Sequence, residues 1–238
     1  MERVLKDFSM SFYKKVGFVA ISVALTACGG GGGDNSSPAP AAPATFPIEA
    51  AVSGFLTSSS AFTTNYTDPD NGDIYTLSYG YAPSGDATFE GVPAKTGVTT
   101  QNFKLNGGFL GAATTTSYFQ LSPVKSLGGT GSGIYGVAGT QTAYPATGKV
   151  GDLGSTGTST IYTDSTKSKV AATAISTWEL SAADSATTAY FCFNNTIKYT
   201  NGNPDAHSSQ CYKIDTKGIV IGNKITMTIN GEVLKFVN

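Results

Sequence analysis

The chain has almost no arginine or histidine, so chemistry that needs an arginine clamp or a histidine cluster is nearly excluded. Its 238 residues include one arginine, Arg3, and one histidine, His207, and only 13% are charged. A single histidine excludes a zinc site built from several histidines. It leaves one possible histidine-based triad, for which no G-x-S-x-G serine is present. Without a basic cluster, the chain has no electrostatic surface for nucleic acid, so we expect no such partner.

Long apolar runs are also absent. The longest covers residues 16–27, which is 12 residues, whereas a membrane-spanning helix needs about 20. Basic residues precede this run, as they do in a secretory signal peptide, and we assign residues 1–27 to such a peptide. A start at Met10 would give this leader a more usual length.

The leader ends in Leu25-Thr26-Ala27-Cys28, and five glycines follow. This sequence resembles the lipobox of bacterial lipoproteins. The resemblance implies cleavage before Cys28 and attachment of acyl chains, such as palmitate, to its thiol and its new amino group. No other cofactor is expected. Several acyl chains make such an anchor effectively permanent. Gly29, in place of an aspartate, implies the outer membrane, and it leaves open whether the body faces the periplasm or the cell surface.

Residues 28–46 are rich in glycine and proline and are predicted to form a tether, because they carry too little apolar surface to fold. The chain from Cys28 onward has 11 lysines and 14 acidic residues, a net charge of −3. The body is assigned to residues 47–238. A faint repeat, residues 64–68 against 160–164, suggests a subdivision near 125–145 into two similar β lobes.

Small hydroxyl residues dominate the body. The chain has 32 threonines, 24 serines and 29 glycines, which favour strands and turns over helices. We therefore predict an all-β fold: an antiparallel sandwich-like body with a short N-terminal helix at residues 47–57, or alternatively a small soluble β-barrel. Strands are predicted at residues 74–81, 99–106, 114–121, 134–137, 158–163, 168–182, 189–194 and 210–215.

The C-terminus carries the strongest local pattern. Two apolar-polar alternating segments, 224–229 and 232–236, flank Asn230-Gly231, which is typical of a two-residue type I′ hairpin loop. That loop pairs Met227 with Leu234, and the residues two positions further out with each other. The pairing places the apolar side chains on one face of a sheet.

Two cysteines remain once Cys28 is assigned to lipid. In an oxidising compartment Cys192 and Cys211 are predicted to form a disulfide, which would stabilise the fold by roughly 3 kcal/mol. The bond either staples a long hairpin or pins a loop that recognises a ligand. The candidate ligand-binding residues of that loop are Tyr199, Asn201, Asp205 and His207.

Two further motifs carry weak signals. An acidic loop with Asp68, Asp70 and Asp73 is a weak calcium candidate, but a polar β-turn is the favoured explanation, and no other metal site is predicted. Ser122 and Lys125 match the S-x-x-K pattern of serine β-lactamases, but the intervening proline argues against the helix that this pattern requires. No catalytic residue is therefore nominated.

These observations favour a non-enzymatic lipoprotein that is anchored in the outer membrane and has an envelope-structural or surface-interaction role. Beyond the leader, the body resembles uncharacterised threonine-rich lipoproteins of Gram-negative bacteria, and the resemblance implies no activity. The alternative is a ligand-binding module for glycans or another exported polymer, with calcium as an optional aid. A hydrolase is a third reading. Membrane contact through the lipid is expected, and the protein or glycan partner is left open.

Overall fold

The computed structural model describes residues 44–131, 133–229 and 232–237. The predicted signal peptide, the predicted lipidation site Cys28 and most of the predicted tether lie outside the described residues. The predicted all-β fold with one short N-terminal helix is confirmed. The elements are β1 Thr45–Phe46, α2 Ile48–Thr57, β2 Ser60–Thr67, β3 Ile74–Phe89, β4 Val92–Leu105, β5 Gly108–Leu121, β6 Val124–Gly131, β7 Ile134–Gln141, β8 Gly148–Lys149, β9 Leu153–Tyr162, β10 Val170–Ala182, β11 Thr188–Tyr199, β12 Ala206–Asp215, β13 Val220–Ile229 and β14 Glu232–Val237.

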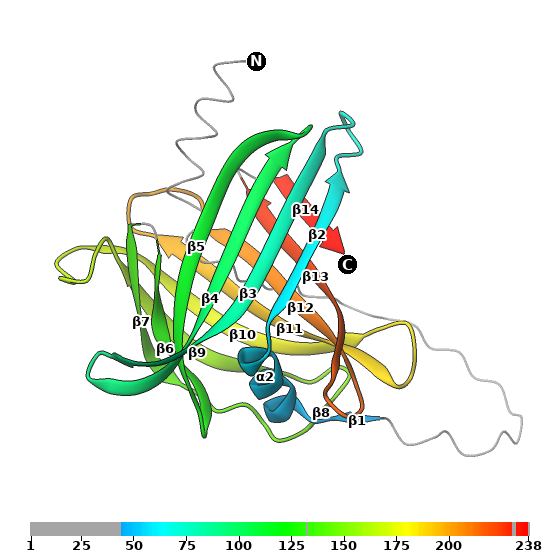
Figure 1. Cartoon of the computed structure of the whole chain (residues 1–238), viewed down its shortest axis with the longest axis horizontal. Helices are drawn as coiled ribbons and strands as arrows, with labels where there is room; N and C mark the ends of the chain where they lie inside the picture. The colour runs from blue at the N-terminus through cyan, green and yellow to red at the C-terminus, as the bar shows by residue number, and fades with distance from the viewer. Residues whose placement is uncertain (1–43, 132, 230–231, 238) are drawn as a thin grey trace, which may run out of the picture.

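Twelve of these strands form one antiparallel sheet in the order β14-β13-β12-β11-β10-β9-β7-β6-β5-β4-β3-β2, which is almost the order of the chain. The sheet curls until its two edges meet (Figure 1). There the Thr64 hydroxyl of β2 donates to the Val237 carbonyl of β14 at 2.7 Å. Closing a sheet on itself removes exposed edges. The architecture is therefore the barrel alternative, nearly closed, and β6 and β7, near the predicted subdivision at residues 125–145, belong to the same sheet as the other strands.

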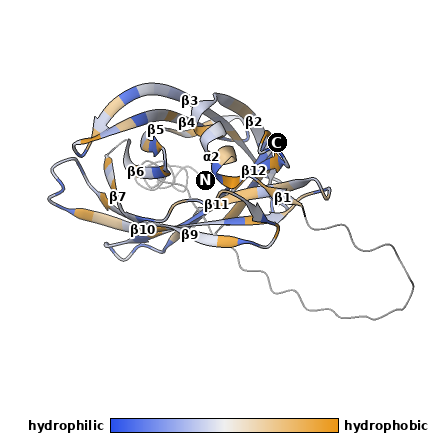
Figure 2. Cartoon of the chain, turned by 90° about the horizontal axis from the view of Figure 1, so that it is seen from below, coloured by the Kyte–Doolittle hydropathy of each residue, from blue (hydrophilic) through white to orange (hydrophobic). Residues whose placement is uncertain are grey.

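Helix α2 lies at one end of the barrel, inside the curve of the sheet (Figure 2). It buries Ile48, Ala51 and Val52, and Phe55 and Leu56 of the same apolar stripe are partly buried against the core. Thr45 does not cap the N-terminus of this helix. It pairs with Lys149 in the short β1–β8 sheet, and the helix begins after Pro47. Phe46 is also fully buried. The body therefore begins two residues before the predicted boundary at residue 47.

The core consists of three clusters of buried side chains, the smallest of which contains Ile161, Ala172, Ala174 and Ile197. Around α2, a cluster includes Phe46, Leu180, Phe191 and Ile214. At the other end, β3 to β5 pack against β13 and β14 through a second cluster that contains Leu77, Phe103, Ile225, Met227, Leu234 and Phe236.

The predicted C-terminal hairpin register is confirmed. Met227 lies opposite Leu234, and Ile225 lies opposite Phe236, so these four buried side chains share the inner face. The tip of the hairpin, residues 230–231, lies outside the described residues.

Residues 126–157 are rich in glycine, and they contain more strand than this composition suggests. Gly128 of β6 illustrates the reason, because a Cβ atom there would lie 2.2 Å from the carbonyl oxygen of Gly136 in β7. Glycine thus permits a close approach of two paired strands. None of the helical residues in the described ranges belongs to a helix that is long and apolar enough to cross a membrane.

Candidate functional site

A cavity of about 270 Å³ lies inside the barrel, bordered by side chains from both end clusters. One end of it is formed by α2, through Val52, Phe55 and Leu56. Lys125 is the one charged side chain of its described lining, which includes no carboxylate. A ligand held here would therefore meet mainly neutral groups.

One wall of the cavity is aromatic. Phe55 of α2 stacks on Tyr212 of β12 with ring centroids 4.5 Å apart, and it meets the edge of Phe193 of β11 at 5.1 Å. Tyr144, from the loop after β7, packs against Phe193 at 6.1 Å. Such rings offer flat apolar surfaces to a ligand at little cost in side-chain entropy.

Hydroxyl and amide groups form the polar part of the cavity lining. Gln210 of β12 donates through Nε2 to the hydroxyl oxygens of Tyr79, at 2.9 Å, and Tyr212, at 2.7 Å. Tyr81 donates its hydroxyl to the carbonyl of Leu56 at the end of α2, at 2.8 Å. These bonds fix the tyrosine rings, so the cavity wall is organised without a ligand.

Tyr81 and Tyr212 stay protonated at physiological pH. Burial, and to a smaller extent Tyr79, raises the pKa of Tyr81 to about 12. Burial raises the pKa of Tyr212 well above its usual value too. Both phenols are therefore neutral hydrogen-bonding groups and not bases.

Local sequence pattern explains how these side chains reach the interior. In β3, Tyr75, Leu77, Tyr79 and Tyr81 alternate with polar residues, so all four point inward. In β12 the same alternation sends Gln210 and Tyr212 inward. Tyr79 and Tyr212 fall in the strands predicted from the sequence, but the sequence pattern assigns neither of them to a site. The period-two pattern was the available signal, but it does not show which strands face one another.

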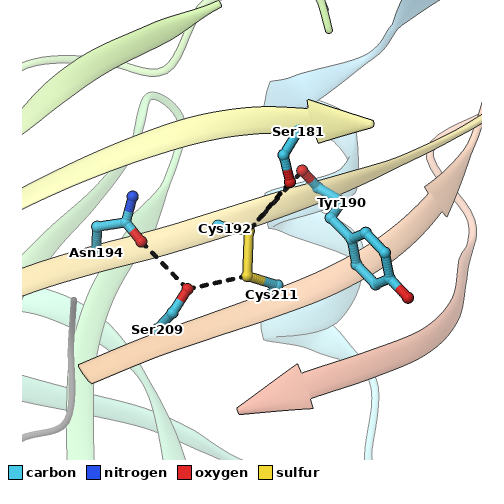
Figure 3. The surroundings of a disulfide bond; sticks show 6 residues. All are labelled: Ser181, Tyr190, Cys192, Asn194, Ser209 and Cys211. Atoms are coloured by element: carbon cyan, nitrogen blue, oxygen red, sulfur yellow. Dashed lines mark hydrogen bonds between the residues drawn. A yellow bond between two sulfur atoms is a disulfide. The ribbon is translucent and has the colours of Figure 1, made fainter. Parts of the chain in front are cut away.

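The predicted disulfide is confirmed, since Cys192 and Cys211 are bonded in the structure. They lie opposite each other on β11 and β12, with Cα atoms 3.9 Å apart (Figure 3). Alternation puts them on the outer face, because their neighbours Phe191 and Tyr212 point inward. The bond therefore staples the wall of the barrel and does not line the cavity.

The four residues predicted to bind a ligand near this disulfide are not brought together. Tyr199 packs against the interior cluster that contains Ile197. His207 lies on the outer face, where its Nδ1 is 3.2 Å from the Thr196 hydroxyl. Asn201 accepts a hydrogen bond from the Asn203 amide within its own turn, and Asp205 is exposed.

The acidic loop is held by its own hydrogen bonds. The carboxylate of Asp68 accepts from the Asp70 amide at 2.9 Å, and that of Asp73 accepts from the Asn106 side chain at 2.8 Å. Across the described ranges, no three histidine, cysteine or acidic residues group as metal ligands.

Comparisons of the chain with protein-family models, with curated proteins and with solved structures give no match.

Proposed function

We propose that this protein binds a small, mainly uncharged organic molecule inside its barrel. The observation that carries the proposal is the cavity of about 270 Å³ lined by aromatic rings, hydroxyls and amides. A dry cavity of about 150 Å³ is enough to take up benzene. This cavity can therefore hold a molecule of roughly one to two rings, with a hydrogen-bonding edge that meets the Gln210 network.

The size of the cavity narrows the ligand class. A volume of about 270 Å³ holds about one sugar ring and not a chain of them, so the glycan alternative is retained in the form of a single sugar unit. A sugar ring and a hydroxylated aromatic ring share the features that matter here: a flat apolar face and hydrogen-bonding groups at the rim. We retain the envelope location as part of the proposal, supported by the lipobox at residues 25–28. The protein would then be a binding module tethered to the outer membrane, without catalytic activity.

The test is a binding screen combined with filling the cavity. Ser176 of β10 lines the cavity, and Ser176→Leu adds apolar volume inside it. Thr173 lies on the same strand, on the exposed face, so Thr173→Leu is a matched control. Simple sugars and hydroxylated aromatic compounds should be screened by the rise in melting temperature. Hits should then be measured by titration calorimetry.

We expect a bound compound to raise the melting temperature of the parent protein and of Thr173→Leu, and Ser176→Leu to bind it much more weakly. Circular dichroism checks that both variants are folded. The proposal is wrong if no compound in either class binds, or if Ser176→Leu binds as tightly as the parent.

A further inference from the structure

Two exposed apolar loops stand at the end of the barrel that holds α2. Val150 and Leu153 lie in the turn between β8 and β9. Ile219, Val220 and Ile221 lie where the chain passes from β12 into β13. These five large aliphatic residues are between 37% and 75% exposed. Isolated exposed apolar residues are ordinary, but grouped ones mark a contact surface.

Both loops adjoin the point at which the tether joins the body. Gly148, just before the first loop, pairs with Phe46 of β1. In the second loop, a Cβ atom on Gly218 would lie 3.0 Å from the Pro47 side chain. Figure 1 shows the β1–β8 pair and the turn between β12 and β13 at the same end of the molecule. The apolar loops therefore flank the segment through which residue 28 is connected.

Each loop is shaped by an aspartate that bonds the loop backbone. Asp152 accepts a hydrogen bond from the Lys149 amide at 2.8 Å. Asp215 accepts from the amides of Lys217 and Ile219, both at 2.9 Å. These turns hold the apolar side chains outward, in a fixed position.

A lysine accompanies each apolar group. Lys149 precedes Val150, Lys217 precedes Ile219 by two positions, and both lysines are exposed. Aliphatic side chains beside lysines suit the boundary between acyl chains and lipid headgroups, where the ammonium groups reach the phosphates.

We infer that this end of the barrel rests on the bilayer that holds the acyl chains of Cys28. The two loops dip their aliphatic side chains into the headgroup region. This inference rests on the proposed lipid anchor and is independent of what the cavity binds. Sixteen residues separate position 28 from the first described residue, and even at full extension they span at most about 55 Å, so the anchor limits how far this end of the barrel can move from the bilayer.

The experiment uses the lipidated full-length protein reconstituted in vesicles of phosphatidylethanolamine and phosphatidylglycerol. Part of the lipid carries bromine near the headgroup end of its acyl chains, where it quenches tryptophan on contact. Leu153→Trp and Ile219→Trp place tryptophan in the two loops. Phe109→Trp is the matched control, because Phe109 is also exposed and lies in β5, next to the turn that closes the opposite end. The signal of the buried Trp178 is subtracted by means of the parent protein.

We expect brominated lipid to reduce the fluorescence of the tryptophans at 153 and 219, and to leave the tryptophan at 109 unchanged. Mass spectrometry and vesicle flotation of the parent test the anchor separately. An unacylated protein that does not float would overturn the anchor and this orientation with it. An acylated protein whose loop tryptophans are not quenched, or are quenched no more than the one at 109, would overturn the orientation alone.

Discussion

At the scale of single residues, two adjacent serines of β12 have opposite environments. Ser208 points inward, and within the described residues its Oγ is buried without a hydrogen-bond partner. Ser209 points outward and donates to Asn194 Oδ1 at 3.3 Å. A buried polar atom without a partner costs stability. We therefore expect Ser208→Ala to maintain or raise the free energy of unfolding, and Ser209→Ala to lower it by about 1 kcal/mol. Urea denaturation of the two variants checks this, and equal losses would contradict it.

Tyr81 gives a second prediction at this scale. Its pKa of about 12 in the folded protein lies above the unfolded value of 10.0. The stability linked to this raised pKa is fully present below pH 10 and is lost as the pH rises from 10 towards 12. We expect Tyr81→Phe to lose less stability over that interval than the parent protein. At pH 7 the free energy of unfolding of the variant should be lower by about 1 kcal/mol, because the hydrogen bond from the Tyr81 hydroxyl to the Leu56 carbonyl is lost. Melting temperatures across pH 7–12 provide the measurement, and parallel curves for the two proteins would refute the assignment.

At the scale of elements, the tip of the β3–β4 hairpin is pinned by one side chain. Glu90 accepts a hydrogen bond from the Tyr135 hydroxyl of β7 at 2.6 Å. It also pairs with Lys167 of the β9–β10 loop. Lys167, followed by Tyr135, lowers the pKa of Glu90. The stabilisation from these contacts of Glu90 is therefore present above the usual glutamate pKa. It is lost as the pH falls through the lowered pKa of Glu90 in the folded protein.

We expect Glu90→Gln to increase amide hydrogen exchange at the hairpin tip and in the β9–β10 loop, because the ion pair that joins them is removed. Asp86→Asn is the matched control. It breaks a pair with Lys95 on the same hairpin in which both partners are more than half exposed, and such pairs contribute little. Equal amide hydrogen exchange in Glu90→Gln and Asp86→Asn would show that Glu90 does not hold the hairpin tip against the β9–β10 loop.

At the scale of the whole molecule, the disulfide limits the unfolded chain. It joins positions 19 apart in sequence, which corresponds to roughly 3 kcal/mol on the chain-entropy model. Both cysteines are 1% exposed, so a reductant reaches the bond only when the barrel wall opens. We expect the double variant Cys192→Ala and Cys211→Ala to lower the free energy of unfolding by about this amount, with no further effect of reductant. Urea denaturation with and without dithiothreitol tests it, and an unchanged midpoint would show that the bond is dispensable.

The sequence by itself determined the all-β class, the short helix after the tether, the register of the last hairpin and the identity of the disulfide partners. Each of these depends on local pattern or on counting: threonine content, helical spacing in residues 47–57, the Asn230-Gly231 turn with period-two alternation, and the two cysteines that remain when Cys28 is assigned to the proposed lipobox.

Only the tertiary structure decided that the strands curl into one nearly closed barrel and that a cavity remains inside it. The reason is distance along the chain. Tyr79 and Gln210 bond to each other across 131 positions, and Phe55 meets Tyr212 across most of the body. Alternation shows that such residues point to one face, but it does not show which strands that face meets. The same limit applies to the two apolar loops, which are far apart in the sequence. They lie near the same segment because Phe46 pairs with Gly148 and Pro47 packs close to Gly218.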